Sequence, residues 1–257
     1  MERYLIARTG GKRLLRKTIA PLIPENIKQY IEPFGGGAWM LFYKDKWAQN
    51  EIYNDIDGDL VNLFRIAKYH PNALSEELKY ALNSREMFYE YYDSKPVTDI
   101  QRAARYFLVI YLSFGAKGGR SFGVRSKYPD TGTGHKSIDI TERLDFVRQR
   151  LKYVVIENRD YKDIIDYYDN KEAFFYLDPP YTKGCKYEIT NDFKDEELFL
   201  KLKNLKGRFL LSYNECEKIR NLYKDYYIKP VERLNGIYGA KDKNKMYKEL
   251  LIANYPF

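Results

Sequence analysis

Hydrophobic residues recur along this chain with two different periods, which together predict an α/β fold. Short apolar runs ending at polar or acidic residues predict strands near 28–34, 50–55, 152–157, 173–177 and 207–214. Apolar residues spaced three or four apart predict helices at 14–22, from about 38, and at 58–70, 161–169, 194–205 and 216–226. Because strands and helices alternate, we expect a Rossmann-like doubly wound sheet, mostly parallel, with helices on both faces.

The alternation is interrupted between residues 71 and 148. Helical patterns run to about residue 114, and a segment rich in Gly, Lys, Arg and Ser follows at 115–137. We interpret 71–148 as an inserted, mainly helical subdomain that divides a catalytic domain made of 1–70 and 149–257. The last two predicted strands, 226–234 and 247–257, are joined by a Lys-rich loop, so the last strand is expected to be antiparallel.

A glycine turn follows the first predicted strand, in "EPFGGGA". Gly35, Gly36 and Gly37 allow positive φ and close approach of a ligand to the backbone. The turn lacks the G-x-G-x-x-G spacing, which disfavours a nicotinamide cofactor. Asp55 follows Gly35 by 20 positions, the usual distance to an acidic residue that binds ribose hydroxyls. We expect Asp55 to bind in this way and Asp57 to cap the next helix.

The charge of the chain makes nucleic acid a candidate binding partner. The net charge is +8, which fits either nucleic-acid binding or simple solubility. Residues 101–136 hold seven Lys and Arg residues against the single acid Asp130. No apolar run reaches membrane-spanning length, and the N-terminus lacks a signal-peptide core. Two cysteines and two histidines form no metal-ligand spacing, so we expect no metal and a cytoplasmic protein.

The most specific motif is "FFYLDPPYTKG", where a buried strand ends in Asp178-Pro179-Pro180-Tyr181. The prolines fix φ, so the turn is stiff and presents a carboxylate, a backbone carbonyl and a phenol ring together. Two acceptors and an aromatic plane suit a planar substrate that carries an amino group. As that nitrogen becomes a nucleophile it gains positive character, which nearby acceptors stabilise.

With "EPFGGGA" and "DPPY" in this order, the chain resembles S-adenosylmethionine-dependent amino methyltransferases. It is most similar to the Dam-type DNA adenine-N6 methyltransferase family, which shares "TGGKRLL", "YNDID" and "ELLIANY". The resemblance touches nearly the whole chain and is weakest from Pro71 to Arg150. It implies methyl transfer to a flipped adenine in a specific short duplex DNA sequence.

The resemblance also implies a cofactor site for S-adenosylmethionine. Asp55 would hold its ribose, and Lys12 would reach its carboxylate or the edge of the active site. Asp160 and Tyr161 would bracket its adenine, and the other cofactor-binding residues would be Arg8, Phe34, Gly35, Gly36, Gly37 and Asp178. Arg8 stands where the family often has an aromatic residue, so backbone contact rather than stacking is expected there.

The same resemblance assigns target adenine to Asp178, Pro179, Pro180 and Tyr181, and the basic segment to double-stranded DNA. Arg120 and Arg125 are candidates to read guanine edges, and Phe122 or Tyr128 to wedge into the gap left by the base. Lys117 and Lys127 would contact the DNA backbone. We expect a monomer, with a cognate restriction endonuclease as a candidate partner. Two alternatives stay open: a cytosine-N4 or RNA adenine methyltransferase, and a catalytically silent DNA-binding relative.

Overall fold

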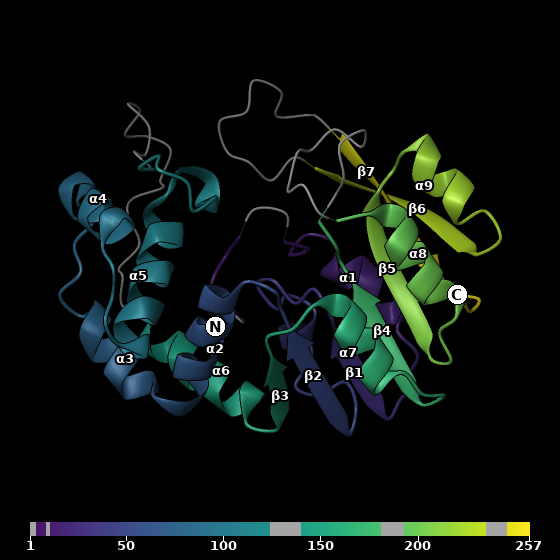
Figure 1. The fold of residues 1–257 in the computed structure, drawn as a ribbon, viewed down its shortest axis with the longest axis horizontal. Coiled ribbons are helices and arrows are strands. Elements are labelled where there is room, and N and C mark those ends of the chain that lie inside the picture. The colour runs from purple at the N-terminus through teal and green to yellow at the C-terminus, as the bar shows by residue number, and fades with distance from the viewer. Residues whose placement is uncertain (1–3, 9–10, 124–139, 181–192, 235–245) are drawn as a thin grey trace.

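A seven-stranded sheet forms the centre of the computed structural model, which describes residues 4–8, 11–123, 140–180, 193–234 and 246–257 (Figure 1). The strand order is β3-β2-β1-β4-β5-β7-β6. The strands are β1 Gln29–Glu32, β2 Asn50–Asn54, β3 Val154–Glu157, β4 Ala173–Leu177, β5 Arg208–Asn214, β6 Tyr227–Leu234 and β7 Met246–Ala253. β1 pairs in parallel with β2 and β4, whereas β7 is antiparallel to both β5 and β6. The predicted doubly wound sheet with an antiparallel last strand is confirmed.

Helices cover both faces of this sheet, and α-helices lie within the predicted ranges 14–22, 58–70, 161–169, 194–205 and 216–226. They are α1 Arg16–Ile19, α2 Gly58–Tyr69, α3 Pro71–Leu78, α4 Arg85–Asp93, α5 Asp99–Leu112, α6 Thr141–Leu151, α7 Tyr161–Tyr168, α8 Asp195–Lys203 and α9 Glu217–Leu222, with 3₁₀ turns η1 Ala20–Leu22, η2 Leu41–Tyr43 and η3 Phe114–Ala116. Helices α3 and α5 pack against α2, α3 also contacts α6, and α4 packs on α5 farther from the sheet (Figure 1). Within the described part of the chain, no helix is both long and apolar enough to span a membrane.

Strand β4 is buried at every position because both sheet faces are covered. Successive side chains of a strand point to opposite faces. Accordingly, Phe174 and Tyr176 pack into a core with α2, α5 and α6, whereas Phe175 and Leu177 pack into a second core with α7, α8 and α9. This explains why "FFYL" is a continuous apolar run rather than an alternating one.

The predicted helix from about residue 38 is wrong. Gly36 and Ala38 have φ values of 50° and 55°, which lie in the left-handed region and cannot begin an α-helix. Only the turn η2 follows before β2. The glycine segment is therefore a turn and not the N-terminus of a helix.

A buried ion pair holds this irregular connection in place. Arg150 of α6 donates two hydrogen bonds to the Glu51 carboxylate, at 2.6 and 2.7 Å. It also donates to the carbonyl oxygens of Leu41 and Lys44, both at 2.8 Å. Because these donors and acceptors are paired, the guanidinium can be buried. A single arginine thus ties α6 to β2 and to the chain beyond the glycine turn.

Candidate active site

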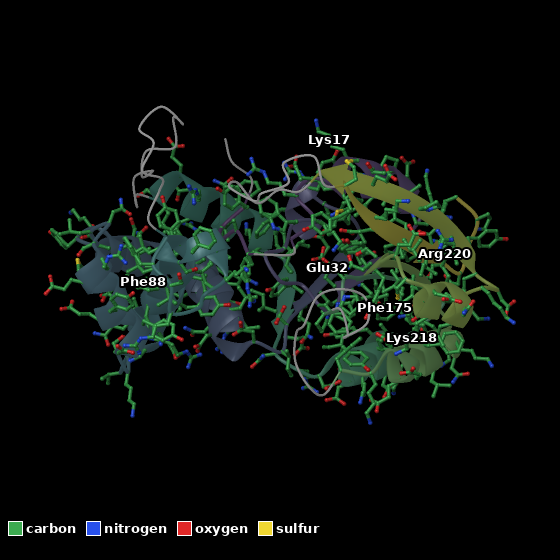
Figure 2. The ribbon with its side chains drawn as sticks, turned by 90° about the horizontal axis from the view of Figure 1, so that it is seen from above. Lys17, Glu32, Phe88, Phe175, Lys218 and Arg220 are labelled. Carbon is green, nitrogen blue, oxygen red and sulfur yellow. The ribbon has the colours of Figure 1, made fainter. Side chains whose placement is uncertain are left out.

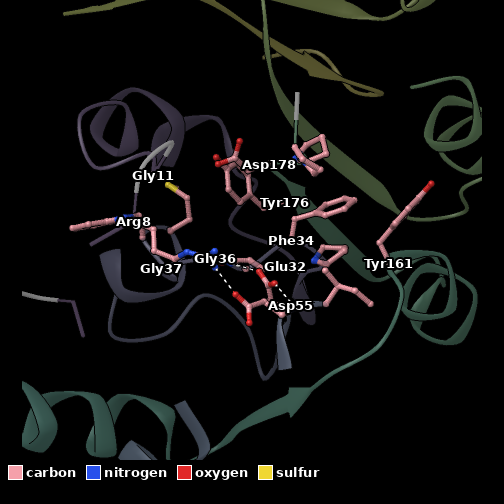
Figure 3. Close-up of a pocket in the computed structure, with 18 of the residues that line it drawn as sticks. Arg8, Gly11, Glu32, Phe34, Gly36, Gly37, Asp55, Tyr161, Tyr176 and Asp178 are labelled. Carbon is pink, nitrogen blue, oxygen red and sulfur yellow. Dashed lines mark hydrogen bonds and ion pairs between the residues drawn. The ribbon is translucent and has the colours of Figure 1, made fainter. Parts of the chain in front are cut away.

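One cavity of about 610 Å³ lies where the carboxyl ends of β1, β2, β3 and β4 meet (Figure 3). Carboxyl ends of parallel strands are the expected ligand-binding edge of a doubly wound sheet. Most of the predicted site residues of the described chain line it, namely Arg8, Lys12, Phe34, Gly35, Gly36, Gly37, Asp55, Asp160, Tyr161, Asp178, Pro179 and Pro180. Tyr181 lies outside the described residues.

Asp55 fixes the shape of the glycine turn. Its Oδ2 accepts a hydrogen bond from the Gly36 N–H at 2.8 Å, and its Oδ1 accepts from the Asp57 N–H at 2.9 Å. Burial raises the pKa of Asp55, and the two backbone donors oppose that shift. Each carboxylate oxygen has two lone pairs, so Asp55 retains capacity for a ligand hydroxyl. As predicted, Asp57 caps α2 by accepting from the backbone of Asp59 and Leu60.

Gly35 is required by close packing. A Cβ at this position would lie 2.2 Å from Cε2 of Tyr53 and 2.9 Å from the Asn54 carbonyl oxygen. The Tyr53 hydroxyl in turn donates to the Gly36 carbonyl oxygen at 2.8 Å. The turn therefore lies directly on β2, which brings the glycines and Asp55 to one wall of the cavity.

Asn54 joins the ends of three strands and was missed by the sequence analysis. Its side-chain nitrogen donates to the carbonyl oxygens of Pro33 and Arg159, at 2.8 and 3.0 Å. Its side-chain oxygen accepts from the Arg159 N–H at 2.9 Å. Because Asn54 is fully buried at the end of β2, these bonds hold the ends of β1 and β3 beside it.

Three aromatic rings form another part of the cavity wall. The rings of Phe34 and Tyr161 lie 5.0 Å apart between centroids, tilted by 33°. Phe193 lies 5.9 Å from Phe34 and 5.7 Å from Tyr161. Phe193 was also missed, since it follows the DPPY motif in a segment without periodicity. The three rings make an apolar wall suited to a flat heterocycle.

Glu32 is a buried carboxylate on the cavity wall that the sequence analysis did not single out. It is the last residue of β1, and its Oε1 accepts a hydrogen bond from the Tyr30 hydroxyl at 2.7 Å. Burial raises the pKa of Glu32 to about 8, although the Tyr30 bond and Arg150 oppose the shift. Its place immediately before "PFGGG" is the signal that would have identified it.

Asp178 follows β4 and forms an ion pair with Lys12. The Lys12 Nζ lies 2.5 Å from Asp178 Oδ1 and 3.6 Å from Oε2 of the buried Glu249 on β7. The Ser212 hydroxyl on β5 donates to Asp178 Oδ1 at 3.2 Å. Burial lowers the pKa of Lys12, but the charges of Asp178 and Glu249 outweigh it, so this pKa lies above its usual value. Burial raises the pKa of Asp178 and Lys12 opposes the shift.

The observed contacts of Lys12 and Arg8 can be compared with the roles expected for them. Lys12 was expected to reach either the cofactor carboxylate or the edge of the active site, and its ammonium here contacts Asp178. Arg8 contacts Asp57, with 3.2 Å between Nη1 and Oδ2, and Asp57 Oδ2 also accepts from the Tyr106 hydroxyl of α5 at 2.7 Å. The start of the chain is thereby linked to α2 and α5.

The predicted DNA-contacting residues lie away from this cavity or outside the described residues. Arg125, Lys127 and Tyr128 lie outside the described residues. Lys117, Arg120 and Phe122 are described, and none of them lines the cavity. The Phe122 ring packs 5.5 Å from the Phe88 ring, in contact with the core of α4 and α5. Phe114, at the start of η3, is instead 53% exposed.

The sheet order, the glycine turn and the proline corner place one ligand-sized cavity at the carboxyl ends of the parallel strands, as in α/β enzymes. Over residues 9–237 the sequence matches the D12 class N6 adenine-specific DNA methyltransferase family, and the chain belongs to that family. It is therefore an enzyme that methylates the N6 amino group of adenine in DNA, and its reaction requires a methyl donor.

Three curated relatives, each named a type II methyltransferase, align with most of the chain. The type II methyltransferase M.MjaIII of Methanocaldococcus jannaschii is 30% identical, with 96% of each chain aligned. The type II methyltransferase M1.LlaDCHI of Lactococcus lactis is 28% identical, covering 96% of this chain and 93% of the relative. The type II methyltransferase M.CviBI of a Chlorella virus is 26% identical, covering 85% of each. Among the described residues, no group of three or more His, Cys, Asp and Glu side chains could hold a metal ion.

Proposed function

We propose that the cavity binds S-adenosylmethionine beside Asp178 and that the chain methylates an adenine flipped out of a specific short sequence in double-stranded DNA. The observation that carries the proposal is Asp178 itself. It ends a central strand, lines the cavity, and is held by Lys12 and Ser212. When bound, S-adenosylmethionine supplies a methyl group on a positively charged sulfur.

The residues present fit this cofactor. A cavity of about 610 Å³ falls within the roughly 300–1,000 Å³ typical of sites for ligands of this size. Gly35 and Gly37 leave room where a Cβ would press on Tyr53 and Trp39, respectively. The aromatic wall of Phe34, Tyr161 and Phe193 offers surface for an adenine ring.

Polar groups of the cavity fit the rest of the cofactor. Asp55 would accept a hydrogen bond from a ribose hydroxyl, and Asp160, which caps α7, would lie next to the adenine. Glu32 would attract the ammonium group of the methionine part, because it is the carboxylate that ends β1 beside the glycine turn.

Asp178 and the two prolines would hold the target adenine. Asp178 would accept one hydrogen from the N6 amino group and the Pro179 carbonyl oxygen the other, with the Tyr181 ring stacked on the base. Both acceptors stabilise the positive charge that develops on N6 as it attacks the methyl group. Holding base and methyl donor in line supplies much of the acceleration. Lys12 and Ser212 keep the Asp178 carboxylate in one orientation.

We further propose that residues 71–148 form the target-recognition subdomain, with 1–70 and 149–257 as the catalytic domain. Helices α4 and α5 and the basic segment after them would contact DNA phosphates and base edges. Phe114 would replace Phe122 as the residue that fills the gap left by the flipped base. The relatives named type II methyltransferases support a cognate restriction endonuclease as partner; we expect a monomer acting in the cytoplasm, where DNA is accessible.

The test is methyl transfer to a DNA duplex by the wild-type protein and by Asp178→Ala, followed by digestion to nucleosides and mass spectrometry. We expect N6-methyladenine from the wild type and a loss of at least about 100-fold in single-turnover rate for the variant. Asp166→Ala, an exposed aspartate on α7, is the matched control and should keep full activity. Undiminished transfer by Asp178→Ala would remove Asp178 from the reaction.

The same digest separates the alternatives. N4-methylcytosine, or transfer to RNA alone, would identify a different target base or nucleic acid. Calorimetric binding of S-adenosylmethionine without turnover on any nucleic acid would favour a silent DNA-binding protein.

A further inference from the structure

The indole N–H of Trp39 is a buried hydrogen-bond donor on the cavity wall. Trp39 is 6% exposed, and its Nε1 has no hydrogen-bond partner among the residues that the structure describes. Buried polar groups in native proteins are nearly always paired, so an unpaired one needs an explanation, which a ligand can provide. The other tryptophan differs: the Trp47 Nε1–H donates to the Met40 carbonyl oxygen at 2.8 Å.

Two glycines pack against the edge of this indole. A Cβ at Gly11 would lie 2.3 Å from Trp39 Nε1, and a Cβ at Gly37 would lie 3.1 Å from it. Both glycines line the same cavity as Trp39. Any larger residue at position 11 would therefore displace the indole or occupy the space in front of its N–H.

The positions of Gly11 and Gly37 indicate which part of the cofactor would lie next to Trp39. Figure 3 shows Arg8, Gly11 and Gly37 together at one end of the cavity, with Phe34 and Tyr161 at the other. The aromatic end suits the adenine ring, so the amino-acid part of the cofactor lies toward the glycines. Its carboxylate is an anion with acceptors only, and it matches an unpaired N–H donor near the cations Arg8 and Lys12.

We infer that Trp39 is a cofactor-binding residue whose indole N–H donates a hydrogen bond to the carboxylate of S-adenosylmethionine. This inference rests on the proposed function and deepens it by assigning the group that recognises one end of the ligand. Gly11 and Gly37 then have a second role, because a side chain at either position would press on the indole nitrogen.

The test compares two ligands that differ in the carboxylate. Isothermal titration calorimetry would measure the binding of S-adenosylmethionine and of its decarboxylated analogue to the wild type and to Trp39→Phe. We expect Trp39→Phe to weaken S-adenosylmethionine binding about 10-fold to 100-fold, the effect of losing a hydrogen bond to a charged group. Binding of the decarboxylated analogue should change by less than about twofold. Equal losses for both ligands, or no loss for either, would overturn the inference.

Trp47→Phe is the matched control. It removes an indole whose N–H is already paired and which does not line the cavity. It should leave the affinity for both ligands unchanged even if it lowers thermal stability. A selective loss of S-adenosylmethionine binding in Trp47→Phe would count against Trp39.

A measurement on folded protein with Trp39 intact covers the case in which Trp39→Phe does not fold. In ¹⁵N-tryptophan-labelled protein, Trp47→Phe assigns the indole resonance of Trp39. S-adenosylhomocysteine, which keeps the carboxylate, should move that N–H resonance downfield, and 5′-methylthioadenosine, which lacks it, should not. The same shift with both ligands would overturn the inference. If the wild type bound neither S-adenosylmethionine nor S-adenosylhomocysteine, the proposed cofactor would be wrong instead.

Discussion

Arg120 donates two hydrogen bonds to the carboxylate of Asp93, at 2.6 and 2.9 Å. Its guanidinium also lies 5.7 and 5.5 Å from the ring centroids of Tyr89 and Tyr92 on α4. Figure 2 shows this part of the molecule, near Phe88, well separated from the Phe175 core. The side chain proposed to read guanine is therefore already engaged with a carboxylate, in the same two-pronged geometry that a guanine edge would use.

Asp93→Asn is expected to raise the affinity for DNA. Asp93 competes with DNA for Arg120, and its charge repels phosphates. Both partners are more than half exposed, so the ion pair itself contributes only about 0–1 kcal/mol. We expect binding about 2-fold to 10-fold tighter at low salt, with the gain shrinking as salt increases. Fluorescence anisotropy with a labelled duplex measures both effects.

Asp166→Asn provides the control for that titration, because it also removes an exposed, ion-paired aspartate but lies on α7. It should leave DNA affinity unchanged. Weaker binding by Asp93→Asn would mean that Asp93 orients Arg120 toward DNA and does not compete with it.

Phe114→Ala is expected to impair base flipping, whereas Phe122→Ala is expected to lower stability. Phe114 is largely exposed, so its truncation should change the free energy of unfolding by no more than about 0.5 kcal/mol. It should nevertheless reduce base flipping, measured by the fluorescence of 2-aminopurine placed at the target adenine. Phe122 packs on Phe88, and its truncation should cost about 1–3 kcal/mol of stability, measured by urea unfolding. Normal flipping by Phe114→Ala would exclude it as the wedge.

The sequence predicted the sheet well because each strand carries a strong local signal. Strand β4 and the DPP corner were readable because a continuous apolar run and two prolines leave few backbone alternatives. Asp57 was recognisable as a helix cap from its place just before α2, and it does accept from Asp59 and Leu60. Each of these depends on residues adjacent in the sequence.

What the sequence did not predict depends on contacts between distant segments. Phe193 meets Tyr161 only because α7 and the segment before α8 lie side by side. The left-handed φ of Ala38 breaks a helix that the apolar spacing favours, and no local rule forbids helix at an alanine. Glu249 contacts Lys12 across 237 positions because β7 inserts between β5 and β6.

Glu249→Gln is expected to affect both stability and catalysis. Lys12 lies between Asp178 and Glu249, and removing one charge from a buried cluster costs more than removing an exposed one. We expect a loss of about 1–3 kcal/mol in the free energy of unfolding and a lower kcat, because the Asp178 carboxylate would then offset more of the Lys12 charge and become a weaker acceptor. Glu232→Gln on the neighbouring strand β6 is the control, since Glu232 is 53% exposed. An unaltered kcat would show that Glu249 does not influence the reaction.

Glu32→Gln is expected to stabilise the ligand-free protein in a pH-dependent manner. Burial raises the pKa of Glu32 to about 8 from a usual value of 4.5, so the folded state holds a proton that the unfolded state has lost between these values. The contribution of Glu32 to stability is therefore fully present below pH 4.5 and is lost as the pH rises to about 8. Glutamine keeps the acceptor for the Tyr30 hydroxyl but cannot ionise.

The advantage of Glu32→Gln over the wild type should thus grow between pH 5 and pH 8, at no more than about 1.4 kcal/mol per pH unit. Urea unfolding at several pH values measures it. Glu172→Gln, at an exposed glutamate, should show a much smaller dependence. A constant difference between Glu32→Gln and the wild type across this range would mean that Glu32 is ionised in the ligand-free protein. The cavity would then already hold a fixed negative charge for the ammonium group of the cofactor, and binding would release no proton from Glu32.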